Sequence, residues 1–314
     1  MDRPSNFSLL KYHVCPKSNT MFPDTVFCAN ARLLQSKWRE EKGYKWGMPE
    51  EGYSYFYDEY NCGDYIEKDI AYNCGCNFLT EKIKVVARKA IEDKKILDVY
   101  RFICHLRSSQ PLCFNLFGEF LNGKEEILVE IFNKLKPKLM DTITKIIFEY
   151  SPGCLGDHTT FDVFIEYKKN DEKSFLGIEV KYAEDLSKDN EKEKEERYFI
   201  AHEQEYTKIT ENHRFFKPDV IDKIRKSQCS QIWRDHLLSI SLKSAKKYDK
   251  GYFVFLYPSN NSECFKGIKD YMNFLEKPED SIFELHLEEL IGAIREKIKE
   301  DWTNELFHRY IEGL

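Results

Sequence analysis

Two acids and one lysine stand close together in a predicted β-hairpin. Asp162 is followed after sixteen residues by Glu179, and Lys181 stands two positions beyond it. If the turn is centred on Asn170 and Asp171, the hairpin pairing brings the two acids directly opposite each other, where like charges destabilise a sheet. A divalent cation between them reverses that sign, because carboxylates and a backbone carbonyl are oxygen ligands that Mg²⁺ prefers.

The alternation of side chains along a strand assigns the charged residues to one face of this hairpin. The opposite face is predicted to be apolar and is formed by Phe161, Val163, Ile165, Ile178 and Val180. Lys181 shares the face of the acids, so its ammonium can orient an attacking water or neutralise charge on a phosphate. The competing interpretation is a surface hairpin in which Lys181 bridges both acids, worth less than about 1 kcal/mol.

Hydrophobic patterns predict the elements that hold the hairpin. Helical spacing of apolar residues predicts helices in residues 80–107, 108–121 and 124–139. Segments rich in β-branched and aromatic residues then predict three consecutive strands, at residues 144–150, 159–167 and 174–182. A helix (230–247), a buried strand (251–258), a further strand (281–287) and a C-terminal helix follow. The order is typical of a mixed α/β core.

Composition limits the class of protein. Of the 314 residues, 42% are hydrophobic, which is enough for a substantial core. No apolar run reaches the roughly eighteen residues that span a bilayer, and the first residues lack the order of a secretory signal. We therefore expect a cytoplasmic protein without a membrane partner. The net charge of −6 does not favour nucleic acid, but a local basic groove or bound metal ions can carry phosphate contacts.

Ten cysteines are scattered through the chain. Without an export signal, reduced thiols are expected rather than disulfides. Cys62, Cys74 and Cys76 lie near enough in sequence to bind zinc with a distant fourth ligand, although their spacing matches no common zinc pattern. Buried or unliganded cysteines are the favoured interpretation.

Four segments in the right order carry a resemblance to a known family. They are SSQPLCFNLFG, FDVFIEY, GIEVKY and QIWRDHLL, within about residues 105 to 258. Together with the spacing of the two acids and Lys181, this pattern resembles the PD-(D/E)XK nuclease superfamily and, within it, bacterial proteins similar to restriction endonucleases. The proline of the superfamily's P-D pair is Phe161 here, a mild departure, because that proline shapes the strand entry.

The resemblance implies a restriction-endonuclease-like αβββαβ core, with a mixed sheet flanked by helices and with N- and C-terminal additions. It implies hydrolysis of DNA phosphodiester bonds with Mg²⁺ as cofactor, for which Mn²⁺ can substitute. The implied metal ligands are Asp162, Glu179 and the carbonyl of Val180, and Lys181 positions the attacking water. Superfamily members often add an acid from the first core helix, for which the candidates are Glu119, Glu126 and Glu130.

Further residues are candidates for contacts with substrate. Gln231 and Arg234 lie one turn apart on a helix where the superfamily often places polar groups against substrate phosphate. An ordinary pair on a helix surface explains them equally well. His158 stands near Asp162 and could assist a second metal, and Glu149 could approach the site from the preceding strand, although a loop histidine and a strand-surface acid are the simpler interpretations.

The predicted organisation is an N-terminal mixed or helical extension over residues 1–105, packed on the core, and a nuclease-like domain over 106–314 with a charged insertion at about 183–226. Partners suggested by the resemblance are DNA, a second copy of the chain in a homodimer, and a cognate methyltransferase. The leading hypothesis is a restriction or defence endonuclease. The alternatives are a catalytically inactive nuclease fold that binds nucleic acid or a protein partner, and a metal-dependent phosphoesterase acting on RNA or small molecules.

Overall fold

The computed structural model describes residues 12, 24–49, 62–184, 186, 189–212 and 214–314. The chain forms two compact units. The first contains Met1–Glu119, Tyr182–Glu184 and Ile291–Leu314, and the second contains Phe120–Lys181 and Asp185–Leu290. The division expected at residue 105 thus differs from the observed one, because three residues after the hairpin and the C-terminal segment also belong to the first unit.

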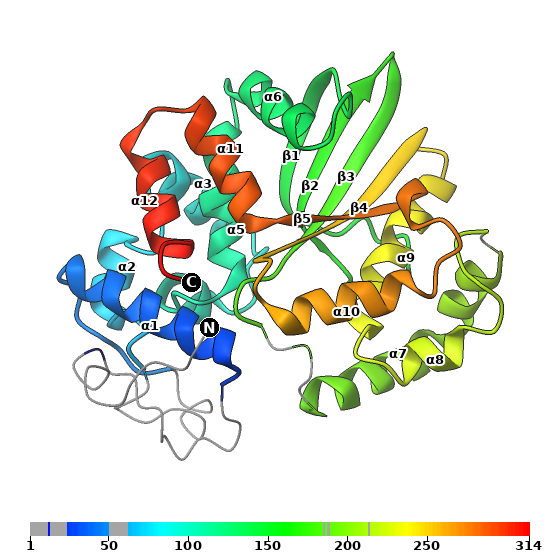
Figure 1. The fold of residues 1–314 in the computed structure, drawn as a ribbon, viewed down its shortest axis with the longest axis horizontal. Helices are drawn as coiled ribbons and strands as arrows, with labels where there is room; N and C mark the ends of the chain where they lie inside the picture. The colour runs from blue at the N-terminus through cyan, green and yellow to red at the C-terminus, as the bar shows by residue number, and fades with distance from the viewer. Residues whose placement is uncertain (1–11, 13–23, 50–61, 185, 187–188, 213) are drawn as a thin grey trace. The chain divides into compact units, whose positions relative to one another are not determined.

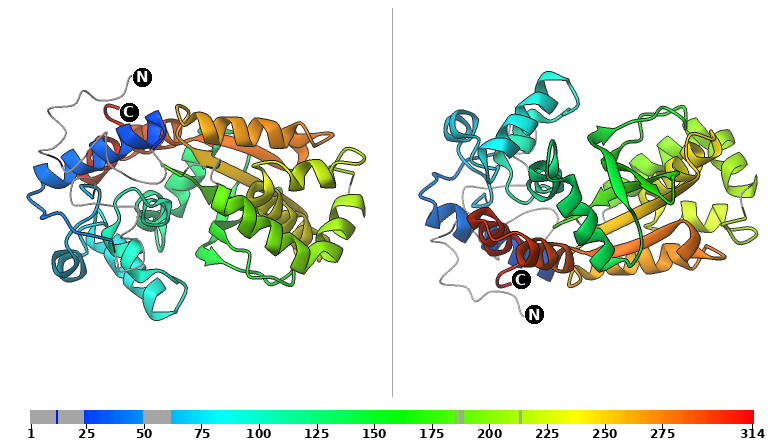
Figure 2. Two further views of the ribbon diagram at one scale, coloured as in Figure 1. Left: turned by 90° about the horizontal axis from the view of Figure 1, so that it is seen from below. Right: turned by 90° about the horizontal axis from the view of Figure 1, so that it is seen from above.

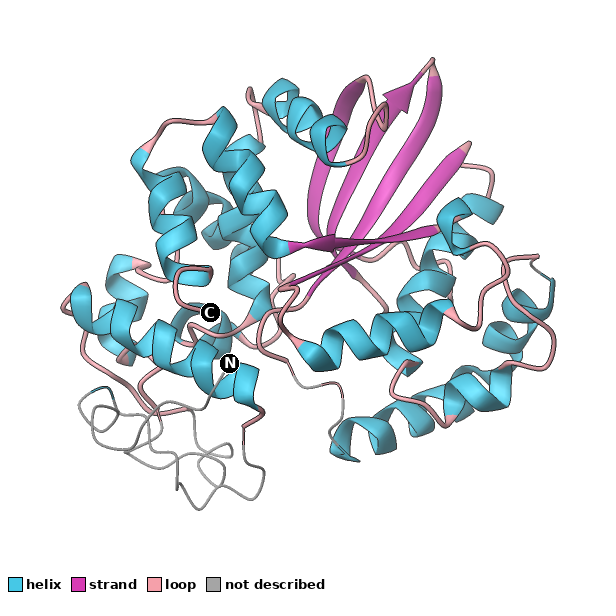
Figure 3. Ribbon diagram, viewed as in Figure 1, coloured by secondary structure: helices cyan, strands magenta, loops and turns pink. Residues whose placement is uncertain are grey.

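A five-stranded mixed sheet forms the second unit's framework (Figures 1 and 3). Its strands are β1 (Thr142–Tyr150), β2 (Phe161–Lys169), β3 (Glu172–Val180), β4 (Lys250–Tyr257) and β5 (Ile282–His286). They lie in chain order; β1, β2 and β3 are antiparallel, whereas β4 and β5 run parallel to β3. The start of β2 therefore lies at the same edge as the ends of β3 and β4. The predicted mixed α/β class is confirmed.

One face of the sheet packs against α9 (Ser230–Ser244). This helix contacts β4, and both α7 (Asp189–Asn212) and α10 (Ser262–Met272) contact α9, a grouping that Figures 1 and 2 show. Phe164 and Phe253 from the strands form a buried apolar cluster with side chains of α9 and α10. The face that carries the two acids is therefore covered and largely apolar away from them.

The other face of the sheet packs against α6 (Glu125–Leu135). Val163 and Ile178 are paired neighbours on this face, and both are fully buried. Lys136, at the end of α6, places its ammonium 4.5 Å from the ring centroid of Phe283 on β5. Both faces of the hairpin are thus covered, as expected for a central hairpin.

The predicted face of one residue is wrong. Phe161 joins the cluster of Phe164 and Phe175 on the α9 side instead of sharing a face with Val163. The physical reason is Gly177, which has no side chain and leaves the space that the Phe161 ring fills. A Cβ atom on Gly177 would lie 2.4 Å from Phe161 Cε1.

Replacing Gly177 with alanine is expected to destabilise the protein by about 1–3 kcal/mol, because overpacking forces the Phe161 ring from its place. Urea unfolding monitored by circular dichroism measures this loss. Gly292 on α11 is the matched control, since a Cβ there meets nothing within 4 Å, so Gly292→Ala should be neutral or stabilising in a helix. Equal stability of the Gly177 variant and the wild type would contradict the packing described above.

The remaining helices are distributed over both units. Within the second unit these are α8 (Ile221–Arg225) and η4 (Pro278–Asp280). The first unit contains α1 (Val26–Glu41), α2 (Lys68–Cys74), α3 (Glu81–Glu92), α4 (Val99–Cys104), α5 (Ser109–Phe117) and α12 (Asp301–Tyr310). The 3-10 turn η3 (Gly118–Phe120) and α11 (Leu287–Lys297) contain residues of both units. None of the helices among the described residues is long and apolar enough to cross a membrane.

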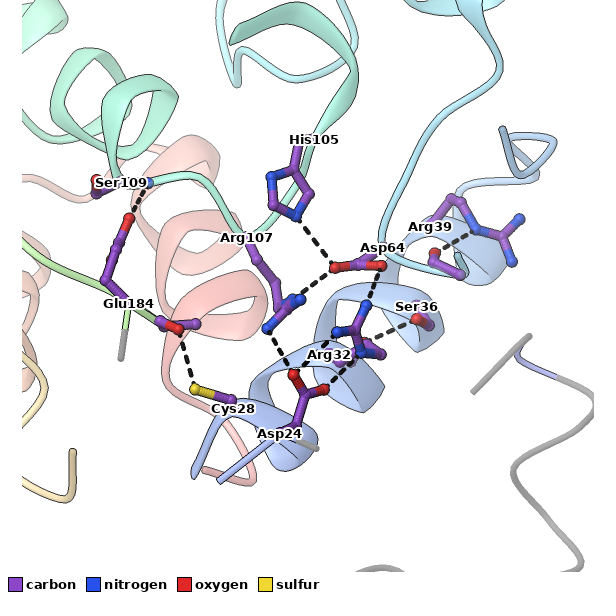
Figure 4. Close-up of polar contacts among 12 residues, drawn as sticks. Asp24, Cys28, Arg32, Ser36, Arg39, Asp64, His105, Arg107, Ser109 and Glu184 are labelled. Atoms are coloured by element: carbon purple, nitrogen blue, oxygen red, sulfur yellow. Dashed lines mark hydrogen bonds and ion pairs between the residues drawn. The ribbon is translucent and has the colours of Figure 1, made fainter. Parts of the chain in front are cut away.

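A buried group of charged side chains connects α1 to the segment after α4 (Figure 4). Asp64 accepts hydrogen bonds from Arg32 (2.9 Å) and Arg107 (2.5 Å), and His105 Nε2 lies 3.2 Å from the same carboxylate. Burial favours a raised pKa for Asp64, but the charges of Arg32 and Arg107 outweigh burial and hold this pKa well below its usual range. Burial lowers the pKa of His105 to about 4, so a neutral imidazole donates to Asp64 at pH 7. This group is structural, since its charges pair with one another.

The sequence interpretation missed several elements. Part of the charged insertion expected at about residues 183–226 forms the helix α7. The C-terminal helix is divided into α11 and α12, and α10 was not predicted. These differences lie outside the hairpin, so they do not change the placement of the two acids.

Candidate active site

The hairpin register predicted from the turn is confirmed. Pairing of β2 with β3 begins at Val163 with Ile178 and continues without a shift to the turn. Asn170 and Asp171 both have positive φ angles, 49° and 64°, as a two-residue turn between twisted strands requires. Continuing this register by one residue places the two acids opposite each other, at the edge where β2 begins and β3 ends.

Short polar contacts join the three predicted catalytic residues. The backbone N–H of Val180 donates to Asp162 Oδ2 at 2.7 Å. Lys181 Nζ lies 2.7 Å from Glu179 Oε1, and both residues are buried, with 5% of Glu179 and 7% of Lys181 exposed. The burial of this ion pair contradicts the interpretation of a surface hairpin with an exposed lysine–acid bridge. Charged side chains are rarely buried, because removing them from water is costly.

Gln231 holds the lysine and the glutamate together from α9. Its Nε2 donates to Glu179 Oε1 at 3.1 Å, and its Oε1 accepts from Lys181 Nζ at 3.1 Å. Both polar atoms of this amide are therefore engaged within the site. The structure thus shows Gln231 fixing the orientation of Lys181, which its sequence position did not indicate, whereas its contact with substrate phosphate stays a prediction.

A pocket of about 290 Å³ opens at this edge of the sheet. Its lining combines both acids, two residues of α9 next to Gln231 and the loop that precedes β2. The lining residues are His158, Thr159, Thr160, Asp162, Glu179, Gln231, Arg234 and Asp235. The two acids, Gln231 and Arg234, predicted from separate segments, are therefore brought to one pocket of the second unit.

The carboxyl group of Asp162 is in surroundings that disfavour its charged form. Burial, and then the charges of Glu179 and Glu149, raise the pKa of the Asp162 carboxyl well above its usual range, and the opposing effects of Lys181 and the Val180 N–H do not compensate. The carboxylate of Asp162 is therefore disfavoured unless another positive charge is present. This is the electrostatic condition under which a bound cation is stabilising.

The residues fit a hard divalent cation that keeps much of its coordination as water. Two carboxylates lie at one pocket, next to the backbone of Val180, and Mg²⁺ is commonly bound by one or two carboxylates with several waters retained. They do not form an all-protein cage. Among the described residues, no group of three or more His, Cys, Asp or Glu side chains is arranged to hold a metal ion.

The three candidate helix acids lie away from the pocket lining or have other partners. Glu126 and Glu130 are exposed on α6, which packs on the sheet face opposite α9. Glu119 belongs to the first unit and is 5% exposed. Its carboxylate accepts a hydrogen bond from Thr80, and Lys82 Nζ donates to its backbone carbonyl at 2.8 Å.

An acid on β1 lies nearer to Asp162. Phe148 pairs with Val163 and Tyr150 with Phe161, so Glu149 stands between these pairs, opposite Asp162. Its φ angle is 49°, an uncommon conformation for a residue with a side chain. The pairing register of β1 with β2 is the signal that would have favoured Glu149 over the helix acids as the additional acid of the site.

The cysteines form no zinc site in the described part of the chain. Cys74 and Cys76 are paired with each other as a disulfide, and Cys62 is a buried free thiol. Seven described cysteines are free, as expected for reduced thiols. The pairing of Cys74 with Cys76 is the exception, and it removes two of the three proposed zinc ligands.

A comparison with protein families agrees with this geometry. Residues 23–312 match the PD-(D/E)XK nuclease superfamily, which is nearly the whole chain. The chain belongs to the PD-(D/E)XK nuclease superfamily. A search of curated proteins and a search of solved structures each found no match.

The match to the PD-(D/E)XK superfamily includes the covered hairpin that carries the buried charges. The match extends well beyond residues 105–258, the part that carried the resemblance in sequence. The first unit from residue 23 onward and the C-terminal helices are therefore parts of the same family pattern. The five-stranded mixed sheet with flanking helices is consistent with the restriction-endonuclease-like fold that the sequence predicted.

Proposed function

We propose that this chain is a Mg²⁺-dependent nuclease that hydrolyses phosphodiester bonds of DNA. The observation that carries this proposal is the pocket itself: both acids line it, and the ammonium of Lys181 is ion-paired with Glu179. A nuclease of this superfamily needs such a set at one place. A purely structural ion pair would not need a second acid opposite it.

The proposed roles follow from the contacts. Asp162, Glu179 and the carbonyl of Val180 would hold the cation, with Mn²⁺ able to replace Mg²⁺. When bound, the cation would act as a Lewis acid toward the phosphodiester and the attacking water. Lys181 would stabilise the negative charge that develops on the phosphate, because its buried ammonium is fixed by two hydrogen-bonding partners.

Contacts with the substrate backbone are proposed for α9 and the segment before it. Arg234 lines the pocket, and a guanidinium is suited to bidentate contact with phosphate. Lys223 and Lys226 are exposed shortly before α9 begins. These local positive charges support nucleic-acid binding by an acidic protein, since phosphate contacts depend on local rather than net charge.

We further propose a role in restriction or DNA defence, supported by the resemblance of four segments to bacterial proteins similar to restriction endonucleases. A homodimer and a cognate methyltransferase would accompany such a role. Methylation of the substrate by the host's own enzymes would then protect it from cleavage.

The second candidate is a catalytically inactive nuclease fold that binds nucleic acid or a protein. The observation that favours it is the absence, among the described residues, of three side chains arranged around one metal position. Binding without cleavage under any divalent cation would support this candidate.

The test is digestion of four substrates by the purified protein with Mg²⁺ or Mn²⁺: plasmid DNA, single-stranded DNA, methylated DNA and RNA. We expect cleavage of DNA that stops when a chelator is added and resumes when the metal is restored. Cleavage that continues in excess chelator would contradict metal dependence. Cleavage of RNA alone would redirect the proposal to a different substrate.

A further inference from the structure

One buried hydroxyl in the pocket has no hydrogen-bond partner. Thr159 lines the pocket, and only 7% of the residue is exposed. Among the described residues, its Oγ1 atom neither donates nor accepts a hydrogen bond. Buried polar groups in native proteins are almost always paired, so this orphaned hydroxyl points to a ligand of the pocket.

The backbone of Thr159 is held on both sides. Its N–H donates to Asp157 Oδ1 at 2.8 Å, and its carbonyl accepts from the Ser151 hydroxyl at 3.2 Å. The other carboxylate oxygen of Asp157 accepts from Tyr206 on α7 at 2.6 Å. The loop before β2 is therefore fixed, whereas the buried hydroxyl of Thr159 has no hydrogen-bond partner among the described residues.

The same network reaches α9. The ring of Tyr206 packs edge-on against Trp233, with centroids 5.6 Å apart, and Trp233 Nε1 donates to Thr210 on α7 at 3.2 Å. Trp233 directly precedes Arg234. Contacts with α7 therefore hold both the loop that contains Thr159 and the helix that contains Arg234, two segments that line the pocket.

We propose that the Thr159 hydroxyl donates a hydrogen bond to a phosphate oxygen of bound nucleic acid, as part of a phosphate subsite that it forms with Arg234. This inference rests on the proposed function. A hydroxyl donor and a guanidinium suit an anionic oxygen. The pocket has a volume of about 290 Å³. Several water molecules together occupy less, since each takes up about 30 Å³ in liquid water, so a phosphate group fits.

Thr159→Val tests the subsite, because valine keeps the shape of threonine and removes only the hydroxyl. Binding is measured by fluorescence anisotropy of labelled single- and double-stranded DNA in Ca²⁺, and cleavage in Mg²⁺. We expect affinity to fall about tenfold, since a hydrogen bond to a charged group is worth about that factor or more, and KM to rise more than kcat falls. The melting temperature should not fall, because no bond within the protein is lost.

Two further variants separate a subsite from a general effect. Thr159→Ser retains the hydroxyl and should restore most of the affinity. Ser281→Ala is the matched control: its hydroxyl is also buried and without a partner among the described residues, its backbone is held by Phe253 and Pro278, and it lies outside the pocket lining. This control should bind and cleave as the wild type does.

The outcomes decide between the possibilities. Unchanged DNA affinity and KM in Thr159→Val would overturn the inference, and so would a wild type that binds no nucleic acid. A change in Mn²⁺ affinity, measured by calorimetry, without a change in DNA affinity would also overturn it, because the hydroxyl would then serve the metal. If the wild type binds but does not cleave, the nuclease proposal fails, and the binding assay still decides the subsite.

Discussion

Lys181→Met is expected to reduce DNA cleavage by at least about a hundredfold while DNA affinity changes little. Methionine keeps much of the length of lysine and removes the ammonium that lies 2.7 Å from Glu179 Oε1 and 3.1 Å from Gln231 Oε1. Loss of one preorganised charge that stabilises a transition state commonly costs about two to three orders of magnitude in rate. Single-turnover cleavage and anisotropy in Ca²⁺ measure the two quantities separately.

The hairpin supplies its own control for this variant. Lys173 on β3 forms an ion pair with Glu166 on β2 at 3.0 Å, and it lies outside the pocket lining. Lys173→Met therefore removes a lysine–glutamate pair from the same hairpin, away from Asp162 and Glu179. The Lys173 side chain is 49% exposed, and exposed pairs contribute little. Cleavage by Lys173→Met should match the wild type. Full activity of Lys181→Met would remove this lysine from the chemistry.

The hairpin could be predicted from sequence because its geometry is local. Two turn residues fix the pairing, and a strand repeats every two residues, so the opposition of the two acids follows from counting. The same counting failed for Phe161, whose ring crosses to the α9 side. The position of the Phe161 ring depends on the space above Gly177. Gly177 lies sixteen residues later on the neighbouring strand, so the side-chain alternation within β2 carries no information about it.

The contacts around the hairpin could not be predicted in the same way. Gln231 meets Glu179 from a helix fifty-two positions later in the chain, and nothing in the helix pattern specifies which partner its amide finds. Thr159 gave no signal, because an unpaired hydroxyl is visible only when its surroundings are known. The bounds of the two units could not be predicted for a similar reason, since Tyr182–Glu184 belongs to the first unit although it directly follows β3.

Asp162→Asn is expected to abolish cleavage and the stabilisation of the protein by metal, while the metal-free protein becomes more stable. Asparagine Oδ1 can still accept from the Val180 N–H, and the charge that burial, Glu179 and Glu149 disfavour is removed. At a free Mg²⁺ concentration about 100 times Kd, the wild type should gain about 2.7 kcal/mol. The variant should gain almost none, and thermal melts with and without Mg²⁺ measure the difference.

The pH dependence of the metal-free proteins has a definite sign. The pKa of Asp162 is raised in the folded state, so the unfolded chain releases this proton first, and wild-type stability falls as pH rises above the ordinary value of 3.8. The advantage of Asp162→Asn should therefore be small near pH 4 and grow toward neutral pH. A constant difference across this range would contradict the shift.

Glu166→Gln is the control with the opposite sign on the same strand. Burial favours a raised pKa for Glu166, but hydrogen bonds from Lys173, Thr144 and Tyr248 outweigh it and lower this pKa. Its replacement should therefore lower stability at neutral pH, with the loss disappearing as pH falls through the lowered folded pKa, and leave the response to Mg²⁺ intact. If Mg²⁺ stabilises Asp162→Asn as much as Glu166→Gln, the cation does not bind at the hairpin acids, and the proposed metal ligands are wrong.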